Sequence, residues 1–376
     1  MIAENPVRTK EAEKAIRQFV AEGSLTEIVP YGNGHINDTY LAVFQTGDGA
    51  EKRYILQRMN HSIFKNPPLL MKNVVGVTQY LRKSILAQGG DPARETLNVV
   101  NTVEGASYYE DDSHNFWRVF LFVEGTLCLE KVESPQDFYD CGAAFGNFQR
   151  MLADYPAKQL HDTIPNFHNT VSRFRDFQRA VREDKVGRAA LAGPEIAFAL
   201  DREKETAVLT DLLEKGELPL RVTHNDTKLN NILFDRVTRK AVCIIDLDTV
   251  MPGLSLYDFG DSIRFGASTG AEDEKDLSRV ELDLNLFEPF TEGFLTGCGG
   301  KLTGREVEML PMGAKLMTYE CGIRFLADFL EGDVYFKVHR ENHNLDRART
   351  QFKIVADMEK KWERMAAIVE KYKNIF

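Results

Sequence analysis

The segment 223–231 carries the side chains in this chain that are best suited to chemistry. It reads Thr-His-Asn-Asp-Thr-Lys-Leu-Asn-Asn, and an apolar strand that ends in Asp246 follows it. The spacing H-x-D-x-x-x-x-N puts Asp226 and Asn231 on one tight turn, so a carboxylate can face an acceptor hydroxyl while an amide oxygen faces a metal ion. Asp246 would supply the second metal ligand, and such oxygen ligands suit Mg²⁺ that is also bound to substrate phosphates. The pattern predicts phosphoryl transfer from ATP, with Asp226 as the catalytic base.

Two further features of this region need an interpretation. Lys228 follows Asp226 by two residues, and we expect its ammonium near the γ-phosphate, where charge builds as the bond breaks; the alternative is a solvated loop lysine. The sequence Asp258-Phe-Gly matches the protein-kinase metal motif, yet it lies 32 residues after Asp226, whereas Asp246 lies 20 after it. We therefore interpret Asp258 and Asp261 as carboxylates that start a helix or brace the loop.

The motifs together resemble the aminoglycoside phosphotransferase and choline kinase superfamily, whose fold is protein-kinase-like, and within it the N-acetylhexosamine 1-kinases. The resemblance covers the segments 31–40, 223–235, 245–251, 257–268 and 320–336. It implies that Asp226 is the base, that Asn231 and Asp246 hold the metal, and that ATP phosphorylates the anomeric hydroxyl of GlcNAc or GalNAc. It also places His35, Arg324 and Tyr335 at the sugar. Without it, His35 is a polar loop residue, and Arg324 could simply pair with Glu320 or Asp328.

The expected nucleotide site departs from the wider superfamily. The strand 54–59 has Gln57 where a phosphate-binding lysine is usual, and the helix 69–88, which would supply its glutamate partner, has no acidic residue. Only one of Gln57 and Arg58 can face the cleft, because side chains alternate along a strand, and the sequence does not say which. The turn Gly32-x-Gly34 is weak evidence for a phosphate loop. For adenine we expect the hinge 120–123, with Phe122 and Val123 at the base.

Two other function classes remain open from the sequence. The chain could be a kinase for another small hydroxyl acceptor, such as an amino alcohol or an aminoglycoside, although Arg324 and His35 suit neutral hydroxyls and an N-acetyl carbonyl better than a cation. It could also be a nucleotide-binding pseudokinase that acts as a scaffold. The intact set of Asp226, Asn231 and Asp246 argues against a scaffold.

The surrounding elements form two predicted lobes. Strands at 25–31, 38–44, 53–59, 97–102 and 116–123 with the helix 69–88 predict a small antiparallel lobe for the nucleotide, preceded by a helix at 11–22. After Glu124-Gly125 the pattern becomes mainly helical, with helices at 134–153, 170–184, 194–215 and from about 272 onward, around a β segment at 220–248. The expected fold class is α+β and protein-kinase-like, with lobes at 1–123 and 124–376, the second holding the catalytic loop and sugar site.

Composition excludes several alternatives. A net charge of −10 over 376 residues argues against nucleic acid as the main partner, which would require a basic face. The charged N-terminal segment does not resemble a signal peptide, and no apolar run reaches the length of a membrane span. The five cysteines are scattered without a C-x-x-C pair, so we expect them reduced. We therefore expect a cytoplasmic monomer that uses ATP and Mg²⁺ and binds neither membranes nor nucleic acid.

Overall fold

The computed structural model describes residues 6–32 and 36–375. Its backbone divides into two compact units. The first comprises the chain up to Leu127 together with Leu160–Ile164 and Leu233–Val250, and the second comprises Cys128–Gln159, Pro165–Ile232 and Met251–Phe376. Two later segments thus return to the first unit. The division into lobes 1–123 and 124–376 stays a prediction. A division at one boundary would not include the two later segments in the first unit.

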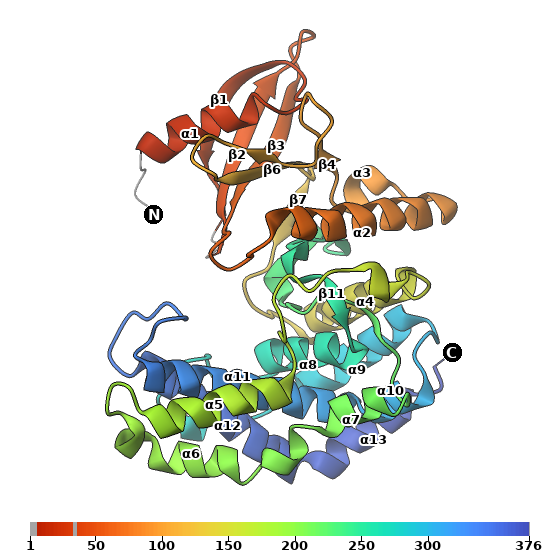
Figure 1. The fold of residues 1–376 in the computed structure, drawn as a ribbon. Coiled ribbons are helices and arrows are strands. Elements are labelled where there is room, and N and C mark those ends of the chain that lie inside the picture. The colour runs from red at the N-terminus through yellow and green to blue at the C-terminus, as the bar shows by residue number, and fades with distance from the viewer. Residues whose placement is uncertain (1–5, 33–35, 376) are drawn as a thin grey trace. The chain divides into compact units, whose positions relative to one another are not determined.

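The first unit is built on a twisted sheet in which every neighbouring pair is antiparallel (Figure 1). Its order is β1-β2-β3-β6-β4, with β5 also paired to β6. Their bounds are β1 Ser24–Pro30, β2 Asp38–Gln45, β3 Glu51–Met59, β4 Val99–Val100, β5 Tyr109–Glu110 and β6 Phe116–Leu121. The four long strands lie where the alternating pattern predicts them, because Tyr40, Ala42, Leu56, Trp117 and Val119 share one buried face.

Three helices accompany this sheet: α1 Pro6–Ile16, α2 Pro67–Ala87 and α3 Pro92–Glu95. α2 begins two residues before the expected start at 69, since the Asn66 side chain accepts a hydrogen bond from the backbone of Leu69 and Pro67 occupies the first turn. The predicted strand at 97–102 is shorter than expected, with only Val99–Val100 in the ladder and an isolated bridge from Phe19 to Thr102.

A second small sheet positions the segment that ends in the candidate metal ligand. Its order is β10-β9-β7, formed by β7 Thr126–Cys128, β9 Ile232–Asp235 and β10 Ala241–Ile244. Asp235 closes the turn between β9 and β10 by accepting hydrogen bonds from the backbone of Val237 and Thr238. Asp246 then adopts a left-handed conformation, with φ 59° and ψ 57°, and leads into the 3₁₀ turn Leu247–Thr249. An aspartate tolerates this conformation better than most residues do.

The second unit is mainly helical. Its helices are α4 Pro135–Met151, α5 Thr170–Glu183, α6 Gly193–Leu200, α7 Val208–Glu214, α8 Ser255–Gly266, α9 Leu284–Cys298, α10 Gly304–Glu308, α11 Leu310–Glu331, α12 His343–Lys360 and α13 Trp362–Tyr372. Single 3₁₀ turns lie at Ala157–Gln159, Ala189–Ala192, Glu203–Glu205, Leu229–Asn231 and Leu277–Arg279, and β8 Arg221–Thr223 pairs antiparallel with β11 Met251–Gly253.

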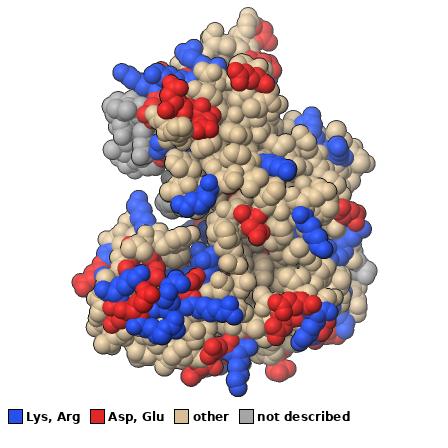
Figure 2. Space-filling model, viewed as in Figure 1, with Lys and Arg blue, Asp and Glu red and all other residues tan. Residues whose placement is uncertain are grey.

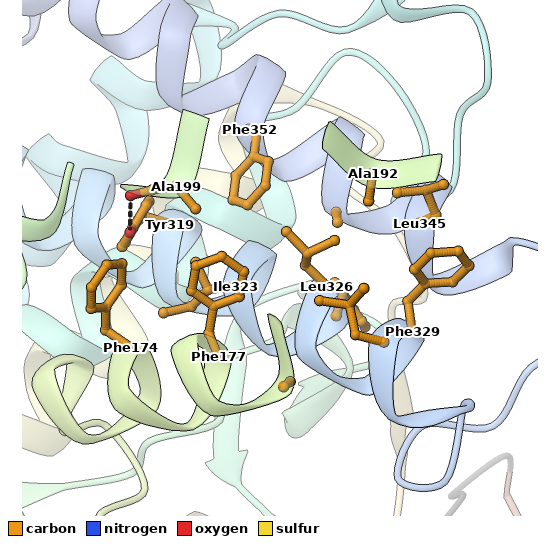
Figure 3. Packing of buried hydrophobic residues seen from close by; sticks show 14 of the residues in the cluster. Phe174, Phe177, Ala192, Ala199, Tyr319, Ile323, Leu326, Phe329, Leu345 and Phe352 are labelled. Carbon is orange, nitrogen blue, oxygen red and sulfur yellow. Dashed lines mark hydrogen bonds between the residues drawn. The ribbon is translucent and has the colours of Figure 1, made fainter. Parts of the chain in front are cut away.

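Helix α11 forms the centre of this unit. Its buried side chains, among them Tyr319, Ile323 and Leu326, pack against Phe174 and Phe177 of α5 and against α12 (Figure 3). Helices α4 and α9 approach closely through glycines: a Cβ at Gly142 would lie 2.4 Å from the carbonyl oxygen of Phe290, so only glycine fits there.

The predicted α+β fold, with a small antiparallel β part and a larger helical part, is confirmed. Three local predictions were wrong. The helix expected at 11–22 spans Pro6–Ile16, the helix expected at 194–215 is interrupted between Leu200 and Val208, and the C-terminal helices begin at Leu284 instead of about 272. Helix α8 is an element that the sequence analysis did not assign. On the face shown in Figure 2, acidic and basic side chains lie intermixed over the helical unit. Within the described ranges, no helix is both long and apolar enough to span a membrane.

Candidate active site

Two aspartates of helix α8 hold the loop 223–231 in place through hydrogen bonds from its backbone. The buried Asp258 carboxylate accepts hydrogen bonds from the backbone of His224 (3.0 Å) and Asn225 (2.8 Å) and from Gln149 Nε2 (2.6 Å). Asp261 Oδ2 accepts another from the backbone of Thr227 at 3.0 Å. Both aspartates are therefore loop-bracing residues, as their position in the sequence indicated. Burial raises the pKa of Asp258 despite the hydrogen bonds that it accepts.

The loop that these bonds shape presents Asp226 between a cation and an amide. Lys228 Nζ lies 2.7 Å from Asp226 Oδ1, and Asn231 Nδ2 donates to Asp226 Oδ2 at 3.1 Å and to its carbonyl at 2.8 Å. Burial disfavours the charged carboxylate, but the Lys228 ammonium outweighs it, so the pKa of Asp226 lies below its ordinary value. The negative charge of Asp226 in turn raises the pKa of Lys228. The result is an ionised carboxylate held in one direction.

Neighbouring residues fix the loop backbone. Asn225 adopts a left-handed conformation with φ 65°, which turns the chain sharply just before Asp226. The His224 ring is fully buried and lies edge-on to the rings of Phe145 and Phe148, with centroids 5.6 and 6.0 Å away. The histidine of the motif thus packs beneath the loop, and its Nδ1 accepts a hydrogen bond from the backbone N–H of Asp226 at 3.3 Å.

His168 is a further positioning residue that the sequence motifs did not reveal. Its Nδ1 lies 2.8 Å from Glu320 Oε1, and its Nε2 lies 3.1 Å from the carbonyl oxygen of Asn225. Both partners can accept hydrogen bonds, an arrangement that favours the doubly protonated ring. Burial opposes this charge, but Glu320 prevails and raises the pKa of His168. Through His168, helix α11 is tied to the residue before Asp226.

Asn231 and Asp246, the two residues predicted to bind a metal, carry oxygen donors of the type that Mg²⁺ prefers. Asn231 uses its amide nitrogen on Asp226, and its Oδ1 accepts no hydrogen bond from any described residue. Asp246 is exposed at the end of its segment, in the first unit. Within residues 6–32 and 36–375 no group of three or more His, Cys, Asp or Glu side chains could hold a metal by itself. One carboxylate and one amide oxygen, completed by phosphates, is the kind of set that Mg²⁺ accepts. The metal roles of Asn231 and Asp246 stay predictions.

The partners of Gln57 and Arg58 show that these two side chains lie on opposite faces of their strand. In the first unit, Arg118 Nε and Nη2 donate to Gln57 Oε1 at 3.0 and 2.8 Å, and Arg118 also forms an ion pair with Asp248. Gln57 therefore faces the segment that contains Asp246 and Asp248. Arg58 points to the other face of the strand, where it pairs with Asp38. A phosphate role for either residue stays a prediction.

Around the expected adenine hinge, most backbone groups have partners inside the protein. The Phe122 N–H donates to the Arg53 carbonyl, and the Val123 carbonyl accepts from Thr126 Oγ1. The peptide between Phe122 and Val123 forms no hydrogen bond to any described residue, so it remains available to a base. Gly32 has φ 77°, as a tight turn requires. Gly34 and His35 lie outside the described residues.

The second unit brings Arg324 and Tyr335 together in an aromatic setting. The Arg324 guanidinium carbon lies 5.3, 5.9 and 5.5 Å from the ring centres of Phe167, Tyr335 and Phe336. Arg173 Nε donates to the Phe167 carbonyl at 3.1 Å, so a second guanidinium meets the same residue. Burial and the nearby charge of Arg324 lower the pKa of Arg173.

Neither acidic residue suggested as a partner for Arg324 takes that role. Glu320 binds His168 and Thr170. Asp328 accepts hydrogen bonds from the backbone of Val334, Tyr335 and Phe336, and so shapes the loop that carries Tyr335. The structural alternative for Arg324, an ion pair with either acid, is wrong.

Comparison with known proteins agrees with this architecture. The model of the phosphotransferase enzyme family (APH) matches residues 27–287. Among solved structures, the fold is similar to that of a microcompartment-associated aminopropanol kinase (TM-score 0.58, 16% identity, 95% of this chain and 98% of that chain covered). It is also similar to an ethanolamine kinase from Plasmodium vivax (0.54, 14%, 87% and 82%) and to an amicoumacin kinase in complex with AMP-PNP and Ca²⁺ (0.55, 13%, 96% and 94%). These structural likenesses show the fold, and the family match covers well over half of the sequence. The chain belongs to the phosphotransferase enzyme family.

Proposed function

We propose that this protein is an ATP- and Mg²⁺-dependent kinase that phosphorylates the anomeric hydroxyl of an N-acetylhexosamine. The observation that carries the kinase assignment is the arrangement of Asp226 between Lys228 and Asn231 on a loop braced by α8. An ionised carboxylate held in a fixed direction can orient an acceptor hydroxyl and take its proton as the phosphoryl group moves. This arrangement also argues against a silent pseudokinase, because every motif residue in the loop is present and engaged.

Each residue has a distinct part in the transfer. Asp226 accepts the hydroxyl proton, and a carboxylate with a low pKa suffices because an anomeric hydroxyl is a hemiacetal, which is more acidic than an ordinary alcohol. Lys228, ion-paired with Asp226 here, would share its charge with the γ-phosphate as negative charge develops there. Asn231 and Asp246 would hold Mg²⁺, which, when bound, neutralises charge on the phosphate oxygens.

The positive charge around Arg324 favours a neutral acceptor. Two guanidiniums, of Arg324 and Arg173, meet at Phe167, and neither forms an ion pair with a described residue. The nearby acids Glu320 and Asp328 are occupied by their own partners. Such a site repels a cation and favours hydroxyl and carbonyl oxygens, which accept charge-assisted hydrogen bonds. An N-acetylhexosamine offers both groups without a positive charge.

The link between this cluster and the catalytic loop supports a shared acceptor site. Arg324 lies one helical turn after Glu320, on the same face of α11. Glu320 binds His168, which in turn binds the carbonyl of Asn225, next to Asp226. The cluster is therefore connected to Asp226 by two side chains within one compact unit.

The competing acceptors are the amines after which two similar structures are named, aminopropanol and ethanolamine. The deciding experiment measures ADP release from Mg²⁺-ATP with GlcNAc, GalNAc, ethanolamine and an aminoglycoside, and uses Asp226→Asn as the control for background hydrolysis. We expect release with both sugars and none above background with the amines. ADP release with the amines alone would refute the acceptor class. If none of the four acceptors stimulated ADP release, the result would count against the sugar-kinase assignment.

A further inference from the structure

A buried ion pair lies directly beside the candidate metal turn. Arg118 in β6 is 1% exposed and Asp248 in the turn Leu247–Thr249 is 2% exposed, and the two side chains form an ion pair although they lie 130 residues apart in the sequence. Isolated charges are not buried in this way, because the desolvation penalty must be offset by a partner and by further hydrogen bonds. Here both are present.

Both side chains of this pair have further partners. The Asp248 carboxylate also accepts from Asn37 Nδ2 at 2.7 Å, and the Asp248 carbonyl accepts from Thr163 Oγ1 at 2.9 Å. The Arg118 guanidinium divides its donors between Asp248 and Gln57, and Gln57 Nε2 donates to Thr39 Oγ1 at 3.1 Å. Both carboxylate oxygens of Asp248 are thus engaged by side chains of the first unit. Asp248 serves to anchor the turn that carries Asp246.

The network joins three parts of the first unit from which a phosphate and metal site is expected. Gln57 stands in the strand position where the wider superfamily has its phosphate-binding lysine. Asn37 follows the glycine turn between β1 and β2, and Asp248 lies two residues after Asp246. On α2, which has no acidic residue, Met71 Sδ lies 4.0 Å from Arg118 Nη1. The buried cation of this unit thus comes from β6, and its anion comes from the metal turn.

We propose that Arg118 is a positioning residue that fixes the turn 246–249 against the sheet and so sets the Mg²⁺ affinity of the nucleotide site. The proposal rests on the proposed kinase function. Arginine is required because its planar group binds Gln57 through two nitrogens and Asp248 through the third, whereas a lysine ammonium cannot bridge both. Residues that orient a metal ligand from behind typically change metal affinity about 10–100-fold when they are replaced.

The test compares nucleotide binding with and without metal. Binding of AMP-PNP is measured by titration calorimetry over a range of Mg²⁺ concentrations and again in EDTA. For Arg118→Lys we expect the Mg²⁺ concentration for half-maximal binding to rise by about tenfold or more, while metal-free binding stays close to that of wild type. Arg202→Lys is the matched control, since Arg202 forms a bidentate, half-buried ion pair with Glu359 in the second unit.

A double variant separates positioning from simple stability. Arg118→Met alone would leave a buried carboxylate without its cation and can unfold the unit, so it is combined with Asp248→Asn, which removes both charges. We expect the melting temperature of the double variant to approach that of wild type, while its Mg²⁺ dependence remains weakened. Recovery of both would show a merely structural ion pair and overturn the proposal.

The outcomes also distinguish this proposal from the proposed function. A wild-type protein that binds Mg²⁺-AMP-PNP but phosphorylates no sugar would refute the acceptor assignment alone, and the comparison with Arg118→Lys would still be decisive. Wild-type binding that is equal in Mg²⁺ and in EDTA would overturn the role of the metal turn. Unchanged Mg²⁺ dependence in Arg118→Lys would overturn the positioning role of Arg118.

Discussion

The assignment of Asp246, and not Asp258, to the metal can be tested with one conservative change made at each position. Asp246 is exposed, and asparagine tolerates its left-handed backbone, so Asp246→Asn removes a charge with little strain. We expect a smaller loss of stability than from the same change at the buried Asp258. Mg²⁺-dependent nucleotide binding should be lost or severely weakened, because an anionic ligand is gone.

The same change at Asp258 has the opposite expected effect. Asp258 Oδ1 accepts from Asn225, and Oδ2 accepts from both His224 and Gln149. In Asp258→Asn, either orientation of the amide points its NH₂ group at one of these donors. At about 1–3 kcal/mol for each buried group left unpaired, two such groups amount to about 2–6 kcal/mol. Burial of the charged carboxylate is unfavourable, as the raised pKa of Asp258 shows, and its removal offsets part of this loss.

We therefore expect Asp258→Asn to destabilise the second unit by about 2–4 kcal/mol, or roughly 4–16 °C in melting temperature. The assay is a thermal melt of both variants, with calorimetric titration of AMP-PNP in Mg²⁺ and in EDTA. The reasoning fails if Asp258→Asn loses the Mg²⁺ dependence with an unchanged melting temperature, while Asp246→Asn melts early and keeps its metal dependence.

Three further predictions concern the catalytic loop and the acceptor site. Asp226→Asn should keep nucleotide binding but lower kcat by about 10²–10⁴-fold, the usual contribution of a general base; unchanged turnover in a folded variant would remove Asp226 from the mechanism. Because the Lys228 ammonium lowers the pKa of Asp226, the base is ionised throughout pH 5–9, and kcat/KM should not fall on the acid side of this range. Lys228→Met removes the main charge that lowers this pKa, so the fall in kcat/KM at acid pH should move to higher pH. Identical pH profiles for wild type and Lys228→Met would contradict this prediction. Arg324→Ala should lower kcat/KM for the sugar by about 1–3 kcal/mol through lost charge-assisted hydrogen bonds, while Arg179→Ala, an exposed arginine on α5, should not; equal losses would show a nonspecific effect.

Local patterns in the sequence predicted the parts of the structure that depend on local physics. Alternation of apolar residues located the long strands of the sheet within one or two residues, since one face is buried against α1. The spacing after Asp226 indicated that Asp258 starts a helix or braces the loop, and its hydrogen bonds from the backbone of His224 and Asn225 confirm the bracing role. The helix expected at 69–88 is α2, which begins two residues earlier because Pro67 occupies its first turn and Asn66 caps it.

Features that depend on distant partners could not be read from the sequence. The ion pair of Arg118 with Asp248 joins residues 130 positions apart, and its single local signal was a charged residue within the apolar strand Phe116–Leu121. The interruption after Leu200 has no glycine or proline to mark it, and Arg202 there binds Glu359 of α12. His168 lies in a loop, and its link between Glu320 and Asn225 exists only in the folded unit.

The central claim, transfer of phosphate to the anomeric oxygen, is tested most directly by NMR of the product formed from GlcNAc and Mg²⁺-ATP. The account predicts phosphorus–proton coupling at H1, the same result with GalNAc, and no product from the methyl glycosides, in which that oxygen is blocked. Coupling at H6, or turnover of a methyl glycoside, would contradict 1-kinase activity.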